Sequence, residues 1–168
     1  SGGNAIPAPV DHFLRNADLI FGIGCSFTKT NFGVDMPPGK AIVHATLDPM
    51  DINKDVACEQ ALIGDAKLVL EALLGELEAQ VSAPRDPAPV ADEIKAVREP
   101  WLAEWQPKLT SDEVPLNPYR VLADLARTVD PDNTIITHDA GSPRDQLSPF
   151  WVSTAPLSYI GWGKTTQL

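Results

Sequence analysis

Residues 17–24 read ADLIFGIG, an apolar run that ends in glycine. A short, continuous apolar run bounded by a turn residue is typical of a strand buried on both faces of a parallel sheet. Two further strands are predicted, at residues 40–47 (KAIVHATL) and 61–63 (ALI). Asp65 is placed to cap a helix over residues 66–81, whose leucines form an apolar stripe. Strands that alternate with loops and helices predict an α/β fold with a parallel sheet.

The composition changes after this helix. Residues 82–90 (SAPRDPAPV) are rich in proline and alanine and have no periodicity, which indicates an extended linker. A helix interrupted at Pro100 is predicted over residues 92–109, with Trp101 and Trp105 four residues apart on one face for helix packing.

A second α/β pattern begins at residue 115. Asn117 followed by Pro118 favours a helix start, and the helix is predicted over residues 119–129. A strand follows over residues 134–138, and residues 159–162 form another short strand or a loop. Neither half has enough strands for a closed sheet, so the sequence predicts two incomplete parallel sheets.

The charge balance and the cysteine content exclude several classes of function. The net charge of -10 disfavours nucleic acid and anionic membrane surfaces as partners, and no apolar run is long enough to span a membrane. Cys25 and Cys58 form neither a disulfide framework nor a CxxC metal motif, and the dispersed histidines supply no metal site, so no metal ligands are assigned. A reduced, cytoplasmic location is expected.

The segment Asp139-Ala140-Gly141-Ser142-Pro143-Arg144 follows the strand predicted at residues 134–138, at the end where α/β folds bind ligands. Gly141 allows close backbone approach, Ser142 offers a hydroxyl, and Arg144 offers a fork of donors that suits a diphosphate. On the pattern alone, a strand-ending turn with a solvated arginine is the stronger interpretation. His138 adjoins this segment.

The segment Gly161-Trp162-Gly163-Lys164-Thr165-Thr166 resembles a phosphate-binding P-loop only superficially. A P-loop requires another glycine five residues before Gly163, where this chain has Ser158. A glycine-rich turn that passes close to a ligand, or one that serves packing, explains the pattern better.

Gly22-Ile23-Gly24-Cys25-Ser26-Phe27 partly matches a dinucleotide loop, but Phe27 stands where the third glycine is needed. Gly24, Cys25, Ser26 and Asp48 are the residues that an ADP or FAD moiety would meet. The alternative is that Asp48 is a turn residue before Pro49. His44, inside a strand, is predicted to be a packed core residue.

Several short motifs of the first half occur together in the order found in one enzyme family. They are Ala17-Asp18, Gly24-Cys25-Ser26-Phe27, Leu47-Asp48-Pro49, Ile52-Asn53-Lys54 and Gly64-Asp65-Ala66. In this order and at these spacings they resemble the later part of the central domain of thiamine-diphosphate-dependent enzymes of the acetolactate synthase and benzoylformate decarboxylase type.

The second half resembles the opening of that family's diphosphate-binding domain, through Asp139-Ala140-Gly141, Phe150-Trp151 and Gly161-Trp162-Gly163. The resemblance implies three parts. Residues 1–81 are the C-terminal part of a Rossmann-like central domain, residues 82–114 a linker with a helix, and residues 115–168 the N-terminal part of the diphosphate-binding domain.

The resemblance implies a fragment of a 2-keto acid decarboxylase or carboligase that uses thiamine diphosphate and Mg²⁺. Gly141, Ser142 and Arg144 would form the diphosphate side of the cofactor site, and Gly161, Trp162 and Gly163 a turn beneath its ring. The family usually has Met, Ile or Leu in this turn, where this chain has Trp162.

The family's GDG…Asn magnesium motif and its activating glutamate have no counterpart in the sequence, so the 168 residues alone are not expected to turn over substrate. The expected partners are the rest of the same enzyme or its subunits, as a homo-oligomer, and a small 2-keto acid. The alternatives are a nucleotide-binding module for FAD or ADP and a structural assembly module.

Overall fold

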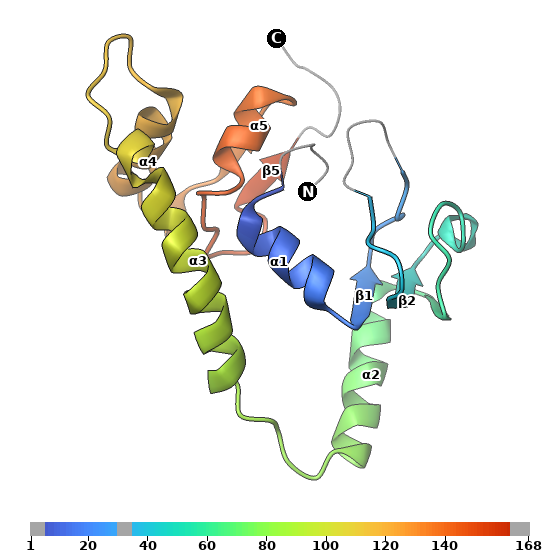
Figure 1. The fold of residues 1–168 in the computed structure, drawn as a ribbon. Coiled ribbons are helices and arrows are strands. Elements are labelled where there is room, and N and C mark those ends of the chain that lie inside the picture. The colour runs from blue at the N-terminus through green and yellow to red at the C-terminus, as the bar shows by residue number, and fades with distance from the viewer. Residues whose placement is uncertain (1–5, 30–34, 162–168) are drawn as a thin grey trace. The chain divides into compact units, whose positions relative to one another are not determined.

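The structure, a computed structural model, describes residues 6–29 and 35–161 of the chain (Figure 1). The chain divides into two compact units, residues 1–95 and residues 96–168.

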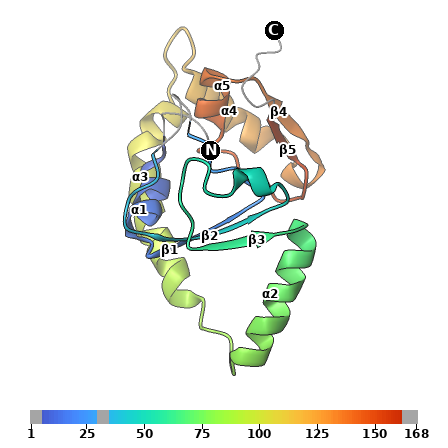
Figure 2. The ribbon, with the colours of Figure 1, turned by 90° about the vertical axis from the view of Figure 1, so that its right-hand side faces the viewer.

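The first unit is built on a three-stranded parallel sheet of order β1-β2-β3 (Figure 2). The strands are β1 (Leu19–Ile23), β2 (Ala41–Thr46) and β3 (Gln60–Ile63). In register, Leu19 lies opposite Ala41 on one side of β2, and Val43 lies opposite Gln60 on the other. The predicted α/β fold with a parallel sheet is confirmed. The strands β1 and β2 are one or two residues shorter at each end than predicted, and β3 begins one residue earlier.

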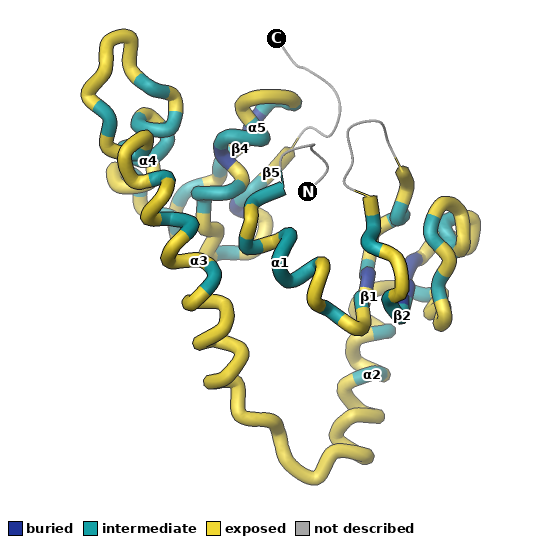
Figure 3. Tube along the Cα trace, viewed as in Figure 1, coloured by how far each residue is buried: buried dark blue, intermediate teal, exposed yellow. Residues whose placement is uncertain are grey.

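The central strand β2 carries the core of this unit. Ile42 and Ala45 are buried, and His44 is fully buried with an exposed fraction of 0%. Residues on both faces of β2 are therefore shielded. The sequence predicted burial on both faces for β1 instead, and that prediction is wrong, because β1 lies at the edge of the sheet and leaves Leu19 51% and Phe21 36% exposed. Within the first unit, Figure 3 shows buried residues mainly at this strand, β2, whereas the surrounding segments are intermediate or exposed.

Helices flank the sheet in sequence: α1 (Ala8–Asn16) precedes β1, the 3₁₀ turn η1 (Pro49–Asp51) follows β2, and α2 (Ala66–Gln80) follows β3. Asp65 caps α2 as predicted, because its carboxylate accepts from the backbone N–H of Lys67 at 2.9 Å and of Leu68 at 3.2 Å. The leucines of α2 are largely exposed in this unit (Figure 3).

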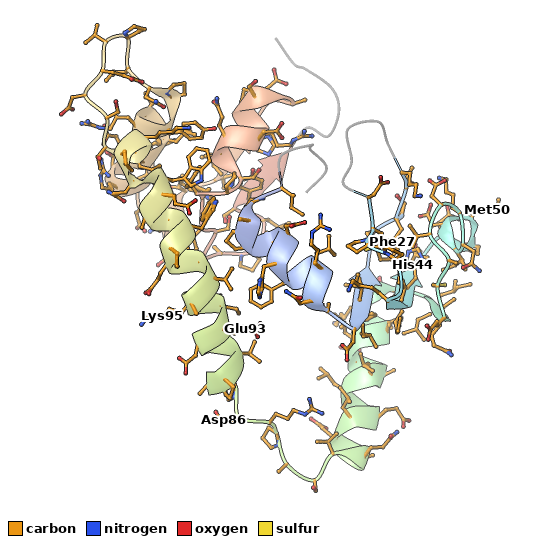
Figure 4. All side chains as sticks on the ribbon, in the orientation of Figure 1. Phe27, His44, Met50, Asp86, Glu93 and Lys95 are labelled. Atoms are coloured by element: carbon orange, nitrogen blue, oxygen red, sulfur yellow. The ribbon has the colours of Figure 1, made fainter. Side chains whose placement is uncertain are left out.

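The aromatic ring of Phe27 packs over β1 and β2 at the carboxyl end of the sheet. It meets His44 edge-on, with 4.8 Å between the ring centroids (Figure 4). A Cβ atom at Gly22 would lie 2.2 Å from Cζ of Phe27. Only glycine leaves room for this ring.

Replacing Gly22 by alanine is therefore expected to displace Phe27 and to lower the free energy of unfolding of the first unit by about 1–3 kcal/mol. Urea unfolding followed by far-UV circular dichroism measures this loss. The matched control is Gly75→Ala in α2, where no atom lies within 4 Å of the added Cβ. It should stabilise the helix by up to about 1 kcal/mol. Equal effects of the two substitutions would contradict the packing of Phe27 on Gly22.

The helix α3 (Ala88–Leu109) leads into the second unit and corrects two predictions. It begins inside the segment predicted as linker, and it continues through Pro100 and Pro107 instead of stopping at Pro100. A proline removes one backbone donor and crowds the preceding turn. In α3 the tryptophans just beyond Pro100 pack against other aromatic rings of the unit, and this packing favours the continuous helix.

The rest of the second unit contains α4 (Pro118–Thr128), the 3₁₀ turn η2 (Pro131–Asn133), β4 (Ile136–His138), α5 (Ser142–Leu147) and β5 (Tyr159–Gly161). Asn117 caps α4 as predicted, accepting from the N–H of Tyr119 at 3.0 Å. The strands β4 and β5 pair in parallel. The sequence did not predict α5, because Gly141 and Pro143 favoured a loop.

An aromatic cluster of Trp101, Trp105, Tyr119 and Phe150 joins α3 to α4 and to the segment after α5. Phe150 is stacked on Trp101 with centroids 5.2 Å apart and meets Trp105 at 5.3 Å and Tyr119 at 5.7 Å. Trp105 and Tyr119 pack edge to face at 4.8 Å. The prediction that the two tryptophans serve helix packing is confirmed.

A charged network on α4 gives the second unit a pH dependence. Arg120 binds Asp124 through Nε at 2.8 Å, and Arg127 also pairs with Asp124. The hydrogen bond from Arg120, followed by the charges of both arginines, holds the pKa of the Asp124 carboxyl below its ordinary value against the opposing effect of desolvation.

Because the pKa of Asp124 is lower in the folded state, the unfolded chain binds the proton first as the pH falls. The stabilisation is complete above the ordinary carboxyl pKa and is lost as the pH falls through the lowered one. We expect Asp124→Asn to flatten the decline in melting temperature at acidic pH. Thermal melts followed by tryptophan fluorescence report this unit, because all four tryptophans lie beyond residue 95. The melting temperature of the unsubstituted chain should fall more steeply with decreasing pH than that of Asp124→Asn, and equal slopes would contradict the role of Asp124.

Candidate functional site

The loop after β4 is the first part of the candidate site. Asp139 and Ala140 leave the strand, with the Ala140 N–H donating to Oδ1 of Asp139 at 2.8 Å. Gly141 follows with φ of 77°, in the region that favours glycine, and no atom lies within 4 Å of the position a Cβ would take. The backbone of Gly141 is therefore open to close approach by another molecule.

Ser142 and Arg144 stand in the first turn of α5, directly after Gly141. The backbone N–H groups of a helix's first turn have no partner within the helix. The Ser142 side chain is exposed. Arg144 donates through Nε to Oδ1 of Asp145 at 2.9 Å, and its side chain keeps 22% exposure. Among the residues that the structure describes, no hydrogen bond engages the two terminal nitrogens of Arg144.

Gly161 lies beside this loop because β5 pairs with β4. In the parallel register His138 is opposite Gly161, so the ends of both strands meet at one edge (Figure 2). The structure thus brings Gly161 next to the strand that ends in the Gly141 loop. Trp162 and Gly163, which the sequence placed in the same turn, lie outside the described residues.

The arrangement at this edge suits a bound anion. The Ser142 hydroxyl, the Arg144 guanidinium and the backbone N–H groups of Ser142 and Arg144 are donors, and a diphosphate carries several acceptor oxygens. Pro143 has no N–H, and the N–H of Asp145 donates to the Gly141 carbonyl. The neighbouring carboxylate of Asp145 offsets part of the charge of Arg144. The donor set and the open space over Gly141 together fit a diphosphate group.

An apolar groove adjoins the loop on the side of α4. It has a volume of about 580 Å³ and is lined mainly by apolar side chains of α4, β4 and α5, with Asp139 and Gln146 among the polar ones. Sequence reasoning did not detect it, because its walls come from segments about twenty residues apart in the chain.

The second candidate edge, in the first unit, is engaged in its own hydrogen bonds. The strands bring Gly24 next to β2, where its N–H donates to the carbonyl of Ala45 at 2.9 Å. Ser26 pairs with Thr28 through their hydroxyls at 2.8 Å, and Oδ1 of Asp48 accepts from the N–H of Met50 at 2.9 Å to cap η1. Asp48 thus acts at least as a turn residue, which was the alternative interpretation.

His44 anchors the loop that contains Cys25. Its Nε2 lies 2.7 Å from the carbonyl oxygen of Cys25, and its Nδ1 is buried without a partner among the described residues. The sequence predicted His44 as a core residue, which its burial confirms. Its bond to the loop was missed, because nothing in a single sequence marks a contact across nineteen residues.

Residues 6–29 and 35–161 contain no group of three or more His, Cys, Asp or Glu side chains that could hold a metal ion. No helix in these same residues has the length and apolar composition needed to cross a bilayer.

Residues 2–73 match the family model described as the thiamine pyrophosphate enzyme, central domain. The matched range covers all three strands of the first unit and the beginning of α2. The first unit is similar to the central domain of the thiamine-diphosphate-dependent enzymes.

Proteins named as acetolactate synthase large subunits match most of the chain. A probable acetolactate synthase large subunit of Methanocaldococcus jannaschii is 29% identical over 91% of this chain and 26% of its own length. Acetolactate synthase isozyme 3 large subunit of Escherichia coli is 29% identical over 92% of this chain and 28% of its own. A probable acetolactate synthase large subunit of Methanococcus aeolicus is 25% identical over 92% and 27%.

The chain therefore spans about a quarter of the length of the relatives it matches. Matches of this extent run through both units, whereas the family model covers the first alone. The family that the first unit matches is described by its cofactor, thiamine pyrophosphate, which is the same molecule as thiamine diphosphate.

Proposed function

We propose that this chain forms part of an acetolactate-synthase-like enzyme that decarboxylates or joins 2-keto acids. In this proposal the second unit supplies the diphosphate side of the cofactor site through Gly141, Ser142 and Arg144. Gly161, with Trp162 and Gly163 after it, supplies the turn beneath the cofactor ring. The observation that carries the proposal is the open Gly141–Arg144 loop beside Gly161, in a chain related to thiamine-diphosphate-dependent enzymes.

Each residue of the loop has a separate role in the proposal. Gly141 admits the anion because it has no side chain and adopts a positive φ. Ser142 donates its hydroxyl, and the planar fork of Arg144 binds phosphate oxygens and orients the group. The hydrogen bond to Asp145 holds the guanidinium of Arg144 in one orientation, and the carboxylate offsets part of its positive charge.

When bound, thiamine diphosphate supplies an electron sink for the decarboxylation of a 2-keto acid. Mg²⁺ accompanies the diphosphate in this proposal, with its ligands supplied by residues outside those described. The chain's own residues bind and orient the cofactor at its diphosphate end.

The proposal predicts that the 168-residue chain binds the cofactor weakly and does not turn over substrate. Because only part of the site is present, we expect a dissociation constant on the order of 1 mM for thiamine diphosphate and binding at least about tenfold weaker for thiamine. Calorimetric titrations measure both. Equal affinities would show that the diphosphate is not recognised. Appreciable decarboxylation of pyruvate or benzoylformate by the purified chain would contradict the proposed division of the active site.

Nucleotide binding at the edge formed by Gly24, Cys25, Ser26 and Asp48 is the alternative, for FAD or ADP. It is not favoured, because the Ser26 hydroxyl, the Cys25 carbonyl and one oxygen of Asp48 already form hydrogen bonds inside the first unit. Flavin absorbance in a purified preparation, or adenine released from it, would support nucleotide binding at this edge.

We further propose that the chain's partners are the remaining parts or subunits of the same enzyme, assembled as a homo-oligomer. Several relatives are named as large subunits. The exposed leucines of α2 support a partner on that helix, because such a row of apolar side chains is costly to leave in water.

A further inference from the structure

His138 lies between the two segments assigned to the cofactor. It is the last residue of β4, opposite Gly161 of β5, and its side chain is buried at 9% exposure. A Cβ atom at Gly161 would lie 3.0 Å from both Cε1 and Nε2 of His138. The imidazole therefore occupies the space that a side chain at position 161 would need.

A hydrogen bond fixes the orientation of this imidazole. Nδ1 of His138 lies 2.9 Å from the carbonyl oxygen of Asp139. A carbonyl oxygen only accepts, so Nδ1 carries the proton, and in the neutral ring Nε2 is the unprotonated nitrogen on the side of Gly161. The same bond fixes the carbonyl group from which the Asp139–Gly141 turn starts.

A second route connects His138 to Arg144. The ring of Tyr159 packs against His138 with centroids 4.9 Å apart, and the Tyr159 hydroxyl lies 2.7 Å from Oγ of Ser148. Ser148 donates its single hydroxyl proton to the carbonyl of Arg144 at 2.8 Å. The Tyr159 hydroxyl must therefore be the donor to Ser148.

We propose that His138 is a positioning residue that holds Gly161 and the Gly141–Arg144 loop at a fixed separation. This inference rests on the proposed function, because the two segments are the ones assigned there to the cofactor's ring and diphosphate. His138 acts in two ways, directly through the carbonyl of Asp139 and indirectly through Tyr159 and Ser148. It does not itself contact the diphosphate.

The test uses ¹⁵N-labelled 168-residue chain and its variants, observed by NMR without any ligand. In the unsubstituted chain the ring nitrogens of His138 should show the Nδ1–H form. Gly161→Ala and His138→Ala should each shift the amide resonances of Ser142 and Arg144, although neither changes that loop. His138→Asn should restore them in part, because its Nδ2 can donate to the Asp139 carbonyl as Nδ1 does. Gly75→Ala in α2 is the control and should leave them in place.

Binding of inorganic diphosphate supplies an independent readout. His138→Ala should weaken it about tenfold and His138→Asn much less, the magnitude expected when one oriented charge-assisted hydrogen bond is lost. If His138→Ala unfolds the unit, Tyr159→Phe is the variant to use in its place. It removes one hydroxyl, and the inference predicts that the amide resonance of Ser148 shifts. Unshifted Ser142 and Arg144 resonances in the folded Gly161→Ala and His138→Ala variants, or an Nε2–H ring, would overturn the inference. A chain that binds no diphosphate, yet shows these shifts, would overturn the proposed function and leave the positioning role of His138 standing.

Discussion

Replacing Phe150 by alanine is expected to lower the free energy of unfolding of the second unit by about 3 kcal/mol. Phe150 contacts the rings of Trp101, Trp105 and Tyr119, with centroids 5.2 to 5.7 Å apart. The substitution removes a ring that contacts the other three rings of the cluster, so it loses both buried apolar area and favourable ring geometry.

Tryptophan fluorescence during urea unfolding measures this effect in the second unit alone, because the first unit has no tryptophan. Phe150→Leu retains most of the volume and should cost about 1 kcal/mol. Phe21→Ala in β1 makes the same chemical change in the other unit and should leave the fluorescence midpoint unchanged. A loss below about 1 kcal/mol for Phe150→Ala would mean that the aromatic cluster does not hold α3 to this unit.

Replacing Arg144 by alanine should weaken the binding of thiamine diphosphate by about tenfold to hundredfold. A hydrogen bond to a charged group is worth about 1.5–3 kcal/mol, and Arg144 is the one cationic side chain in the Gly141–Arg144 loop. Arg144→Lys keeps the charge but loses the planar fork, so an intermediate loss is expected.

Titration calorimetry with thiamine diphosphate compares these variants with Arg98→Ala, which removes an exposed arginine from α3 and changes the net charge equally. The two alanine variants separate specific contact from general attraction of an anion to positive charge. If Arg98→Ala and Arg144→Ala weaken binding to the same extent, Arg144 makes no direct contact.

The helices and strands of the first unit could be predicted closely, because their signals are local. The run at residues 17–24, the cap at Asp65 and the apolar β2 each act within a few residues. The path of α3 through Pro100 could not be predicted, since it depends on aromatic contacts with residues of α4 and with Phe150. The helix α5 was missed because the local signals of Gly141 and Pro143 indicated a loop.

The sequence could predict which residues form the candidate site, but not how these residues lie relative to one another. Gly141, Ser142 and Arg144 are adjacent in sequence, so their grouping followed from the motif. That Gly161 lies next to β4 required the strand register, and the role of His138 required the space over Gly161. Pairing between distant segments leaves no mark that one sequence can reveal.

The most direct test of the central claim is a map of the amide resonances of the ¹⁵N-labelled chain during titration with thiamine diphosphate and Mg²⁺. The account predicts concentration-dependent shifts at Ser142, Arg144 and Gly161, with the residues from Gly24 to Ser26 unmoved. Shifts confined to Gly24–Ser26, or none at Ser142 and Arg144 at saturating cofactor, would contradict it.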